Sequence, residues 1–266
     1  MTTTLRAPIP AHAATDLERD GYLVWPDLLD PSEMDALRTR ADALWASDHP
    51  RSRQVLYVNG QVPPETRPLD ALLHQWLNPH RLPPSEGTGG LLAPVQAAAA
   101  ALLEAEPVLF QDLLLVKTPS QARFPWHQDF PFWPVDRPQG LVCWIPLVAN
   151  EESGGGLTFA RGSHRSGVGP AIDLHRGTAQ DASVPLTFEP SSWPHDCPAL
   201  RPGDAVFFSP LTWHASGKRA TPGQRAAWSS VWLHPSVCWH HARARAHSAC
   251  RETTDGAPVG PLAPRA

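Results

Sequence analysis

The sequence carries little excess charge of either sign. Its 266 residues hold 22 Lys and Arg against 26 Asp and Glu, which gives a formal net charge of −4 at pH 7. A protein that binds nucleic acid or an anionic membrane surface usually shows a basic patch, and the basic runs of this chain are short. We therefore expect a small-molecule partner, with neither nucleic acid nor membrane among the partners, and a monomer or homodimer.

Cysteine is scarce as well. The four cysteines lie far apart and form no Cys-x-x-Cys pair: Cys143, Cys197, Cys238 and Cys250. This spacing indicates neither a zinc knuckle nor a disulfide framework. No apolar run approaches the roughly 18 residues that span a bilayer, and the N-terminus lacks a signal-peptide pattern. We expect a soluble, cytoplasmic protein with reduced thiols.

The chain also lacks a strand-helix-strand alternation with a glycine-rich phosphate loop, which argues against a doubly wound nucleotide-binding fold. It is instead rich in proline, with 31 residues, and has 18 glycines beside 42% hydrophobic and 18% charged residues. This composition favours a globular protein with many turns. The length suits a single β sandwich or barrel.

Helix signals occur in the N-terminal part of the chain. Asp30 suits the N-cap of a helix, Pro31 suits its first helical position, and Glu33 completes a capping box with Asp30. A helix should therefore begin at Pro31. Further helices are expected over residues 69–77 and 91–103. From Pro107 onward the pattern changes to short apolar runs between turn residues, and the expected strands cover 108–116, 141–148, 184–188, 205–208 and 225–233.

These elements indicate one domain over residues 1–240. A helical part over about 14–105 should pack on one sheet of a β core over about 107–234. Residues 241–266 mix Arg, His, Gly and Pro without periodicity, so we expect a flexible tail there. The histidines of this region, His240, His241 and His247, are assigned no role.

A candidate metal site begins at His127 and Asp129. Residues two apart in a strand point to the same face with Cα atoms about 6.7 Å apart, so these two side chains would project together while Gln128 turns away. A third ligand must come from another strand, and His214 follows a turn and an apolar run that suit one. Two strands of a jelly roll can bring the three side chains together.

Two neutral imidazoles and one carboxylate form the facial arrangement of non-haem Fe(II) oxygenases, which leaves positions open on the metal. A structural zinc site would use four ligands, usually with thiolates, and no cysteine lies near His127. A hydrogen-bonded pair of His127 and Asp129 without metal is the simpler alternative. The joint presence of His214 and Arg225 favours the metal site.

The region 107–234 resembles the phytanoyl-CoA dioxygenase family of iron- and 2-oxoglutarate-dependent oxygenases. The likeness rests on residues 117–129, 154–157, 162–164 and 203–229, on His214-Ala215-Ser216-Gly217, and on an arginine eleven residues after the histidine. The resemblance implies a mainly β fold with flanking α-helices, whose core is a double-stranded β-helix, the cupin-like jelly roll, with the N-terminal helices packed on one sheet. It also implies the cofactors Fe(II), 2-oxoglutarate and O2.

The resemblance further implies a role for five residues in binding 2-oxoglutarate. Arg225 would bind the distal carboxylate, because a guanidinium offers a planar fork of donors and stays charged when buried. Ser216 and Ser229 match hydroxyl donors of the family, Trp144 matches an aromatic that lines the co-substrate pocket, and Lys117 matches a family lysine. We expect Arg225 on the strand paired with the one that carries His214.

The residues around the metal motif are candidates for substrate contacts: Gln128, Phe130, Phe132 and Trp133. The expected reaction is hydroxylation of an unactivated C–H bond of a small molecule, such as a natural-product intermediate, with conversion of 2-oxoglutarate and O2 to succinate and CO2. Asp129 argues against halogenation, because halogenating relatives carry a small residue at this coordination position. Desaturation, epimerisation, ring formation, a zinc hydrolase and a non-catalytic metal-binding jelly roll remain open.

Overall fold

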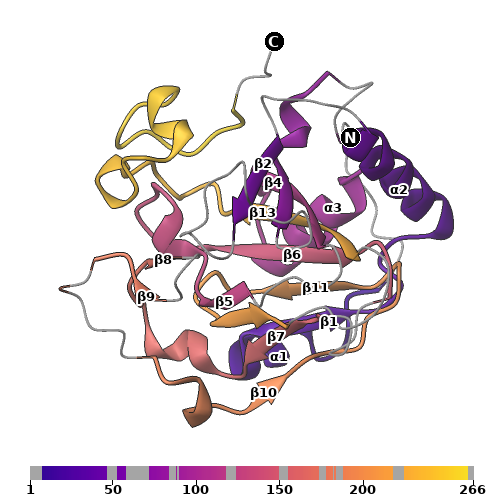
Figure 1. Ribbon diagram of the computed structural model, residues 1–266, viewed down its shortest axis with the longest axis horizontal. Coiled ribbons are helices and arrows are strands. Elements are labelled where there is room, and N and C mark those ends of the chain that lie inside the picture. Colours follow the sequence, from indigo (N-terminus) through magenta and orange to yellow (C-terminus); the bar gives the residue numbers. More distant parts are fainter. Residues whose placement is uncertain are drawn as a thin grey trace.

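Two antiparallel sheets face each other beneath a layer of helices in the computed structural model (Figure 1). The structure describes residues 8–46, 53–57, 72–83, 88, 90–117, 124–149, 155–173, 178–181, 183, 188–217 and 225–262. The helices are α1 (Ala13–Asp20), α2 (Pro31–Ala46) and α3 (Ala93–Leu103). The strands are β1 (Tyr22–Trp25), β2 (Arg53–Tyr57), β3 (Leu72–Leu77), β4 (Val108–Lys117), β5 (Phe124–His127), β6 (Gly140–Pro146), β7 (Leu157–Ala160), β8 (Ile172–Asp173), β9 (Thr178–Ala179), β10 (His195–Asp196), β11 (Ala205–Phe208), β12 (His214–Ser216) and β13 (Arg225–Leu233).

The larger sheet has the strand order β1-β11-β6-β13-β4-β3-β2, and the smaller has the order β10-β7-β12-β5. Strands β8 and β9 form a separate hairpin. Short 3-10 helices connect the strands: Pro79–Arg81, Phe130–Phe132, Ser163–Ser166, Pro190–Ser192, His241–Arg243 and Ser248–Arg251. The expected mainly β fold with flanking helices is confirmed.

The helices cover the outer face of the larger sheet. Side chains of α2 and α3, such as Leu37 and Val95, join Leu114 and Trp228 of the sheet in one buried cluster. Helix α2 begins with the expected capping box, since the backbone N–H of Asp30 donates to Glu33 Oε2 (2.8 Å) and the N–H of Glu33 donates to Asp30 Oδ1 (2.9 Å). No helix within the described ranges is long and apolar enough to cross a membrane.

Most of the expected elements lie where the sequence placed them, but no helix forms at residues 72–77, which are the described part of the helix expected over 69–77. These residues form strand β3, which pairs antiparallel with β4. The side chains of this segment alternate between two faces, as in a strand: Trp76 is buried among the helices, while Gln75 and Leu77 face the space between the sheets. Of the strand expected at 184–188, residues 184–187 lie outside the described residues.

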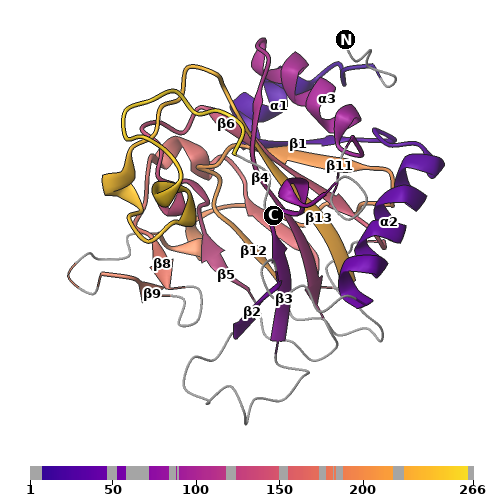
Figure 2. The same ribbon diagram turned by 90° about the horizontal axis from the view of Figure 1, so that it is seen from above.

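The C-terminal segment also differs from the expectation of a flexible tail. Ala249 and Val259 are buried in the core between the two sheets, together with Trp239. The ion pair between Arg81 and Glu252 ties the segment to the body of the protein. Figures 1 and 2 show this segment in yellow on the side of the molecule away from α2. Residues 241–262 are therefore part of the fold, because their few apolar side chains reach the core.

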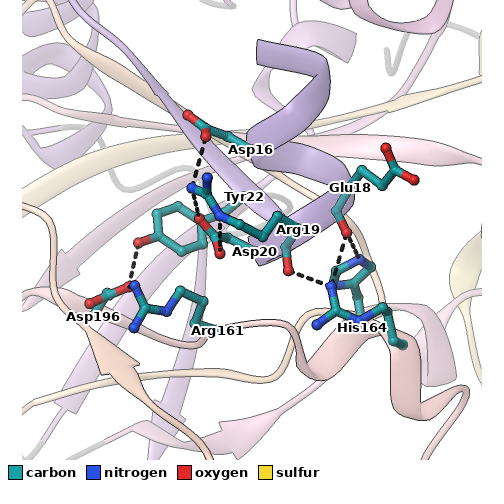
Figure 3. A network of polar contacts seen from close by, with 9 residues as sticks. Asp16, Glu18, Arg19, Asp20, Tyr22, Arg161, His164 and Asp196 are labelled. Atoms are coloured by element: carbon teal, nitrogen blue, oxygen red, sulfur yellow. Dashed lines mark hydrogen bonds and ion pairs between the residues drawn. The ribbon is translucent and has the colours of Figure 1, made fainter. Parts of the chain in front are cut away.

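The start of β1 contacts the smaller sheet, and the end of helix α1 contacts the 3-10 helix that follows β7 (Figure 3). Tyr22, just after the helix, stacks on Phe159 with ring centroids 4.5 Å apart and donates its hydroxyl to Asp196 Oδ2 at 2.9 Å. The guanidinium of Arg165 donates to the carbonyl oxygens of Glu18 and Arg19 at the end of the helix. These contacts connect the N-terminal helix to the turn after β7.

Candidate metal centre

The two histidines of the motif come from paired strands of the smaller sheet. His127 on β5 lies opposite His214 on β12, and their ring centroids are 4.1 Å apart. Asp129 Oδ1 lies 3.6 Å from His127 Nε2 and 3.8 Å from His214 Nε2. The three side chains therefore converge on one point.

The backbone at Asp129 is not in the extended strand conformation that the sequence predicted. Strand β5 ends at His127, and Asp129 has helical backbone angles (φ −79°, ψ −39°) at the start of the 3-10 helix Phe130–Phe132. The backbone N–H groups of Asp129 and Phe130 both donate to the carbonyl oxygen of Pro210 at 3.2 Å. The carboxylate is thus held by a turn rather than by the alternation of a strand.

Backbone hydrogen bonds orient both imidazoles. His127 Nδ1 lies 2.9 Å from the carbonyl oxygen of Pro125, and His214 Nδ1 lies 3.0 Å from that of Thr212. A carbonyl oxygen only accepts, so Nδ1 carries the proton in each ring. The Nε2 lone pairs of both rings are then directed to the side where Asp129 lies. This arrangement is typical of histidines that bind a metal.

Burial keeps both imidazoles neutral. It lowers the pKa of His127 to about 3, with a further contribution from the neighbouring His214, and the pKa of His214 to about 4. Burial also raises the pKa of the Asp129 carboxyl, and the nearby His127 opposes this effect. A cation bound between the three groups would favour the carboxylate form, because opposite charges stabilise each other.

The donor set fits a divalent transition metal. One ligand atom from each of the three residues can be chosen so that all lie within 4.8 Å of one another. Neutral imidazoles and a carboxylate suit iron, and three protein ligands leave positions for other molecules. The free thiols do not enter the site, since Cys143 is buried on the outer face of the larger sheet.

The three residues open into a cavity of about 300 Å³ between the two sheets. Its lining is mostly apolar: Gln75, Leu77, Gln111, Leu113, Leu115, Lys117, Phe124, His127, Asp129, Phe132, Trp133, Val142, Trp144, Leu157, Phe208, His214, Ala215, Ser216, Arg225, Ser229, Val231 and His247. Small-molecule sites commonly combine such an apolar wall with a few polar groups.

Two buried basic residues lie at one end of this cavity. Arg225 on β13 is directly opposite Lys117 on β4, and both residues are at most 3% exposed. Lys117 Nζ donates to Ser216 Oγ (2.7 Å) and to the carbonyl oxygen of Gly217 (2.9 Å). Burial, assisted by the charge of Arg225, lowers the pKa of Lys117 to about 6. An anion at this end would relieve the repulsion between the two basic groups.

Arg225 does not lie on a strand paired with the one that carries His214. Strand β13 belongs to the larger sheet and β12 to the smaller, so the connection after His214 crosses from one sheet to the other. The two residues nevertheless face the same cavity. The guanidinium lies 5.5 Å from the ring centroid of Trp144 and donates to the carbonyl oxygen of Gly155. Ser229 pairs with Trp144 across the neighbouring strands and also lines the cavity.

Only two of the four expected substrate residues line the cavity. Phe132 and Trp133 do, because the 3-10 helix after Asp129 turns them toward it. Gln128 is wholly buried elsewhere: its Nε2 donates to the carbonyl oxygens of Gly167 (2.8 Å) and Leu211 (2.7 Å), and its Oε1 accepts from the N–H of Gly169 (2.7 Å). Phe130 is also buried and lies outside the lining, with the Arg243 guanidinium 4.5 Å from its ring.

Three polar residues of the lining were not expected from the sequence: Gln75, Gln111 and His247. Gln111 could have been found, because it continues the every-second-residue pattern of Leu113, Leu115 and Lys117 on β4. His247 carries no such signal, since it lies in an irregular segment whose place in the fold depends on distant contacts.

The chain is similar in sequence to known proteins. The sequence profile of the phytanoyl-CoA dioxygenase family matches residues 17–227. An ectoine dioxygenase of Stutzerimonas stutzeri (strain A1501) is 28% identical over 250 residues, which cover 86% of this chain and 78% of that protein.

Solved structures share the fold, including its jelly-roll core. SnoK, a non-haem α-ketoglutarate-dependent carbocyclase from nogalamycin biosynthesis, matches with a TM-score of 0.76 at 19% identity and covers 96% of both chains. EctD from S. alaskensis, solved with 2-oxoglutarate and 5-hydroxyectoine, matches with a TM-score of 0.66 at 26% identity and covers 89% of this chain and 80% of EctD. The chain belongs to the phytanoyl-CoA dioxygenase family and is an iron- and 2-oxoglutarate-dependent oxygenase.

Proposed function

We propose that this protein hydroxylates an unactivated C–H bond of a small molecule, such as a natural-product intermediate. His127, Asp129 and His214 hold the iron, and 2-oxoglutarate is the co-substrate. One oxygen atom of O2 enters the substrate and the other enters succinate, while the C1 carboxyl group of 2-oxoglutarate leaves as CO2. The iron supplies the oxidising power of this reaction when it is bound.

One observation carries the assignment of the co-substrate: two buried basic residues, Lys117 and Arg225, face the same cavity as the three ligands. A guanidinium binds a carboxylate through two parallel hydrogen bonds, and a buried lysine adds a second positive charge. The dianion 2-oxoglutarate has one carboxylate for this end of the cavity and a keto-acid group for the metal. Ser216 offers a hydroxyl group at the same end, and Ser229 lines the cavity four residues farther along β13.

The remaining side chains orient the reactants and exclude water. The protonated Nδ1 atoms of His127 and His214 are fixed by backbone carbonyl groups, so the Nε2 atoms keep their direction during turnover. Phe132, Trp133 and Leu113 form an apolar wall beside Asp129 against which a substrate can lie. Such a wall limits the access of water to the reacting atoms.

Ring formation is the second candidate outcome, because the neighbour SnoK is described as a carbocyclase. EctD was solved with the hydroxylated compound 5-hydroxyectoine, which favours hydroxylation. Desaturation and epimerisation also begin with removal of a hydrogen atom from the substrate. These reactions diverge only after that removal, and the ligand set is the same for all of them.

The test is anaerobic addition of Fe(II) and 2-oxoglutarate to the purified protein, followed by exposure to air. We expect an absorption band that requires both components, and slow formation of succinate in air without any added substrate. Asp129→Ala should abolish both signals. A protein that binds Zn(II), gives no band with Fe(II) and forms no succinate would be a hydrolase or a binding protein instead.

A further inference from the structure

The end of the cavity away from Arg225 is formed in part by the C-terminal segment, residues 240–262. Lys117 and Arg225 are paired at one end of β4 and β13, and Gln111 is paired with Val231 six residues farther along β4. Six residues of a strand span about 20 Å. His247 of the C-terminal segment lines the cavity and stacks on Phe110, next to Gln111, with ring centroids 5.6 Å apart and an interplanar angle of 20°.

Backbone hydrogen bonds join this segment to the residues that follow β13. The N–H of Trp239 donates to the carbonyl oxygen of Ala257, and the N–H of Gly256 donates to that of Trp239, both at 2.8 Å. The N–H of Val259 donates to the carbonyl oxygen of Val237 at 2.8 Å. Polar groups on a segment that is fixed in this way keep their positions, so they can distinguish one substrate from another.

The contacts of His247 define which ring nitrogen carries the proton. Its Nδ1 accepts a hydrogen bond from the backbone N–H of Ala249 at 3.2 Å, and burial lowers its pKa to about 4. The imidazole is therefore neutral at pH 7, and its one proton is on Nε2. Within the described chain this Nε2 has no hydrogen-bond partner, so it is a donor available to a ligand.

The side-chain alternation of β4 places Gln111 in the same wall, and a β-bulge turns Phe110 to the same face. The register of β4 and β13 shifts between Val231 and Trp232, which leaves Phe110 without a partner and places it on the inner face beside Gln111. Bulges often redirect side chains next to active sites. The side-chain amide of Gln111 makes no hydrogen bond to any described residue and is also available to a ligand.

The described lining residues at this end carry no charge. The lysine, arginine and carboxylate groups of the lining are Lys117, Arg225 and Asp129, which belong to the co-substrate end and to the cluster with His127 and His214. Beside Gln111 and His247 lie Val231, Leu113 and Trp133. A carboxylate or ammonium group placed here would lose its hydration without gaining a counter-ion, which is costly.

We propose that Gln111 and His247 determine substrate specificity by binding a carbonyl or hydroxyl oxygen of an uncharged substrate whose apolar body packs on Trp133. The Nε2–H group of His247 and the amide of Gln111 donate to that oxygen. This inference rests on the proposed function, because it takes the metal centre as the place where the bound molecule is oxidised.

Binding of three matched probes tests the proposal on the protein loaded anaerobically with Fe(II) and 2-oxoglutarate. The probes share one bicyclic skeleton: tetralin without oxygen, 1-tetralone with a carbonyl group, and 1,2,3,4-tetrahydro-1-naphthoate with a carboxylate. Calorimetry should give the tightest Kd for 1-tetralone. Equal affinity for tetralin, tighter binding of the carboxylate, or no binding of any probe would overturn the proposal.

Two variants separate the hydrogen bond from packing. His247→Phe keeps the stack on Phe110 and should weaken 1-tetralone binding about 5- to 10-fold without changing the Kd of tetralin. His247→Gln, whose amide nitrogen can replace Nε2, should restore most of the affinity. His240→Phe, at an exposed position of the same segment, is the matched control and should change neither Kd.

The absorption band of the Fe(II)–2-oxoglutarate complex distinguishes a failure of the specificity proposal from a failure of the proposed function. A normal band with no preference for 1-tetralone rejects the specificity pair and leaves the oxygenase assignment intact. If the band is missing, the proposed function fails, and calorimetry still ranks the three probes. A loss of tetralone affinity in His247→Phe that matches the loss for tetralin would indicate a purely structural role.

Discussion

His127 and His214 lie directly opposite each other on β5 and β12, and each donates its Nδ1 proton to a carbonyl oxygen of its own strand region. Both Nε2 atoms therefore point to the same place, within 4 Å of Asp129 Oδ1. The backbone of the smaller sheet thus preorganises the two histidines of the proposed metal centre.

Replacing Asp129 with alanine should remove the carboxylate ligand and reduce 2-oxoglutarate turnover at least about 100-fold, since even indirect damage to a metal site commonly costs 10- to 100-fold. Iron content after anaerobic loading, measured by mass spectrometry, should fall in parallel. Asp181→Ala, at an exposed position outside the cavity, is the control. Full turnover by Asp129→Ala would show that Asp129 is not a ligand.

Replacing Arg225 with methionine should raise the KM for 2-oxoglutarate about 10- to 100-fold, because a charge-assisted hydrogen bond contributes about 1.5–3 kcal/mol. Iron binding should persist. Arg225→Lys should recover only part of the affinity, since an ammonium group cannot reproduce the planar fork. An unchanged KM in Arg225→Met, with Arg137→Met as an exposed control, would place the co-substrate elsewhere.

Binding of 2-oxoglutarate should be coupled to proton uptake at Lys117. Its pKa is lowered to about 6 by burial and by Arg225, so the free protein holds a neutral amine at pH 7.5. The co-substrate dianion favours the ammonium form and raises this pKa, so affinity should fall as the pH rises above about 6. Calorimetry in buffers of different ionisation enthalpy should detect uptake in the wild type and none in Lys117→Met. Equal uptake in both would assign the proton to another group.

The low pKa of Lys117 also affects folding. The pKa rises to its ordinary value of 10.5 in the unfolded chain, so the unfolded state binds more protons between about pH 6 and pH 10.5. The contribution of Lys117 to the free energy of unfolding should therefore increase as the pH rises through this window. Lys117→Met should flatten that dependence in denaturant titrations of the metal-free protein.

Gln128 should act as a positioning residue for the metal ligands on either side of it. Its three hydrogen bonds join the chain between His127 and Asp129 to Gly167, Gly169 and Leu211. Gln128→Glu keeps an acceptor but loses both donors, and we expect Fe(II) to bind about 10- to 100-fold more weakly. Unchanged iron affinity together with a lower melting temperature would indicate a structural role alone.

Sequence patterns within a few residues were sufficient to predict many of the helices and strands. The capping box of Asp30 and Glu33 marks the start of α2, and the strands β11 and β13 have the expected bounds. The convergence of His127, Asp129 and His214 was also predictable, because a metal site requires particular side chains and the eleven-residue spacing from His214 to Arg225 is unlikely to arise by chance. These features depend on residue type and on distances along the chain.

Features that depend on distant contacts were not predictable in this way. A short apolar run such as 72–77 suits a helix or a strand, and its pairing with β4 decides the outcome. The assignment of Arg225 to the sheet opposite His214 follows from the order of strands. The C-terminal segment has no periodicity, and its position follows from contacts such as those of Trp239 and Val259 with the core.

The central claim is that His127, Asp129 and His214 hold iron that couples O2 to the decarboxylation of 2-oxoglutarate. Incubation of the iron-loaded protein with 2-oxoglutarate under 18O2, followed by mass spectrometry of the succinate, tests it most directly. We predict one 18O atom in the succinate from the wild type and no succinate above background from Asp129→Ala. Succinate without 18O, or the same labelled yield from both proteins, would contradict the claim.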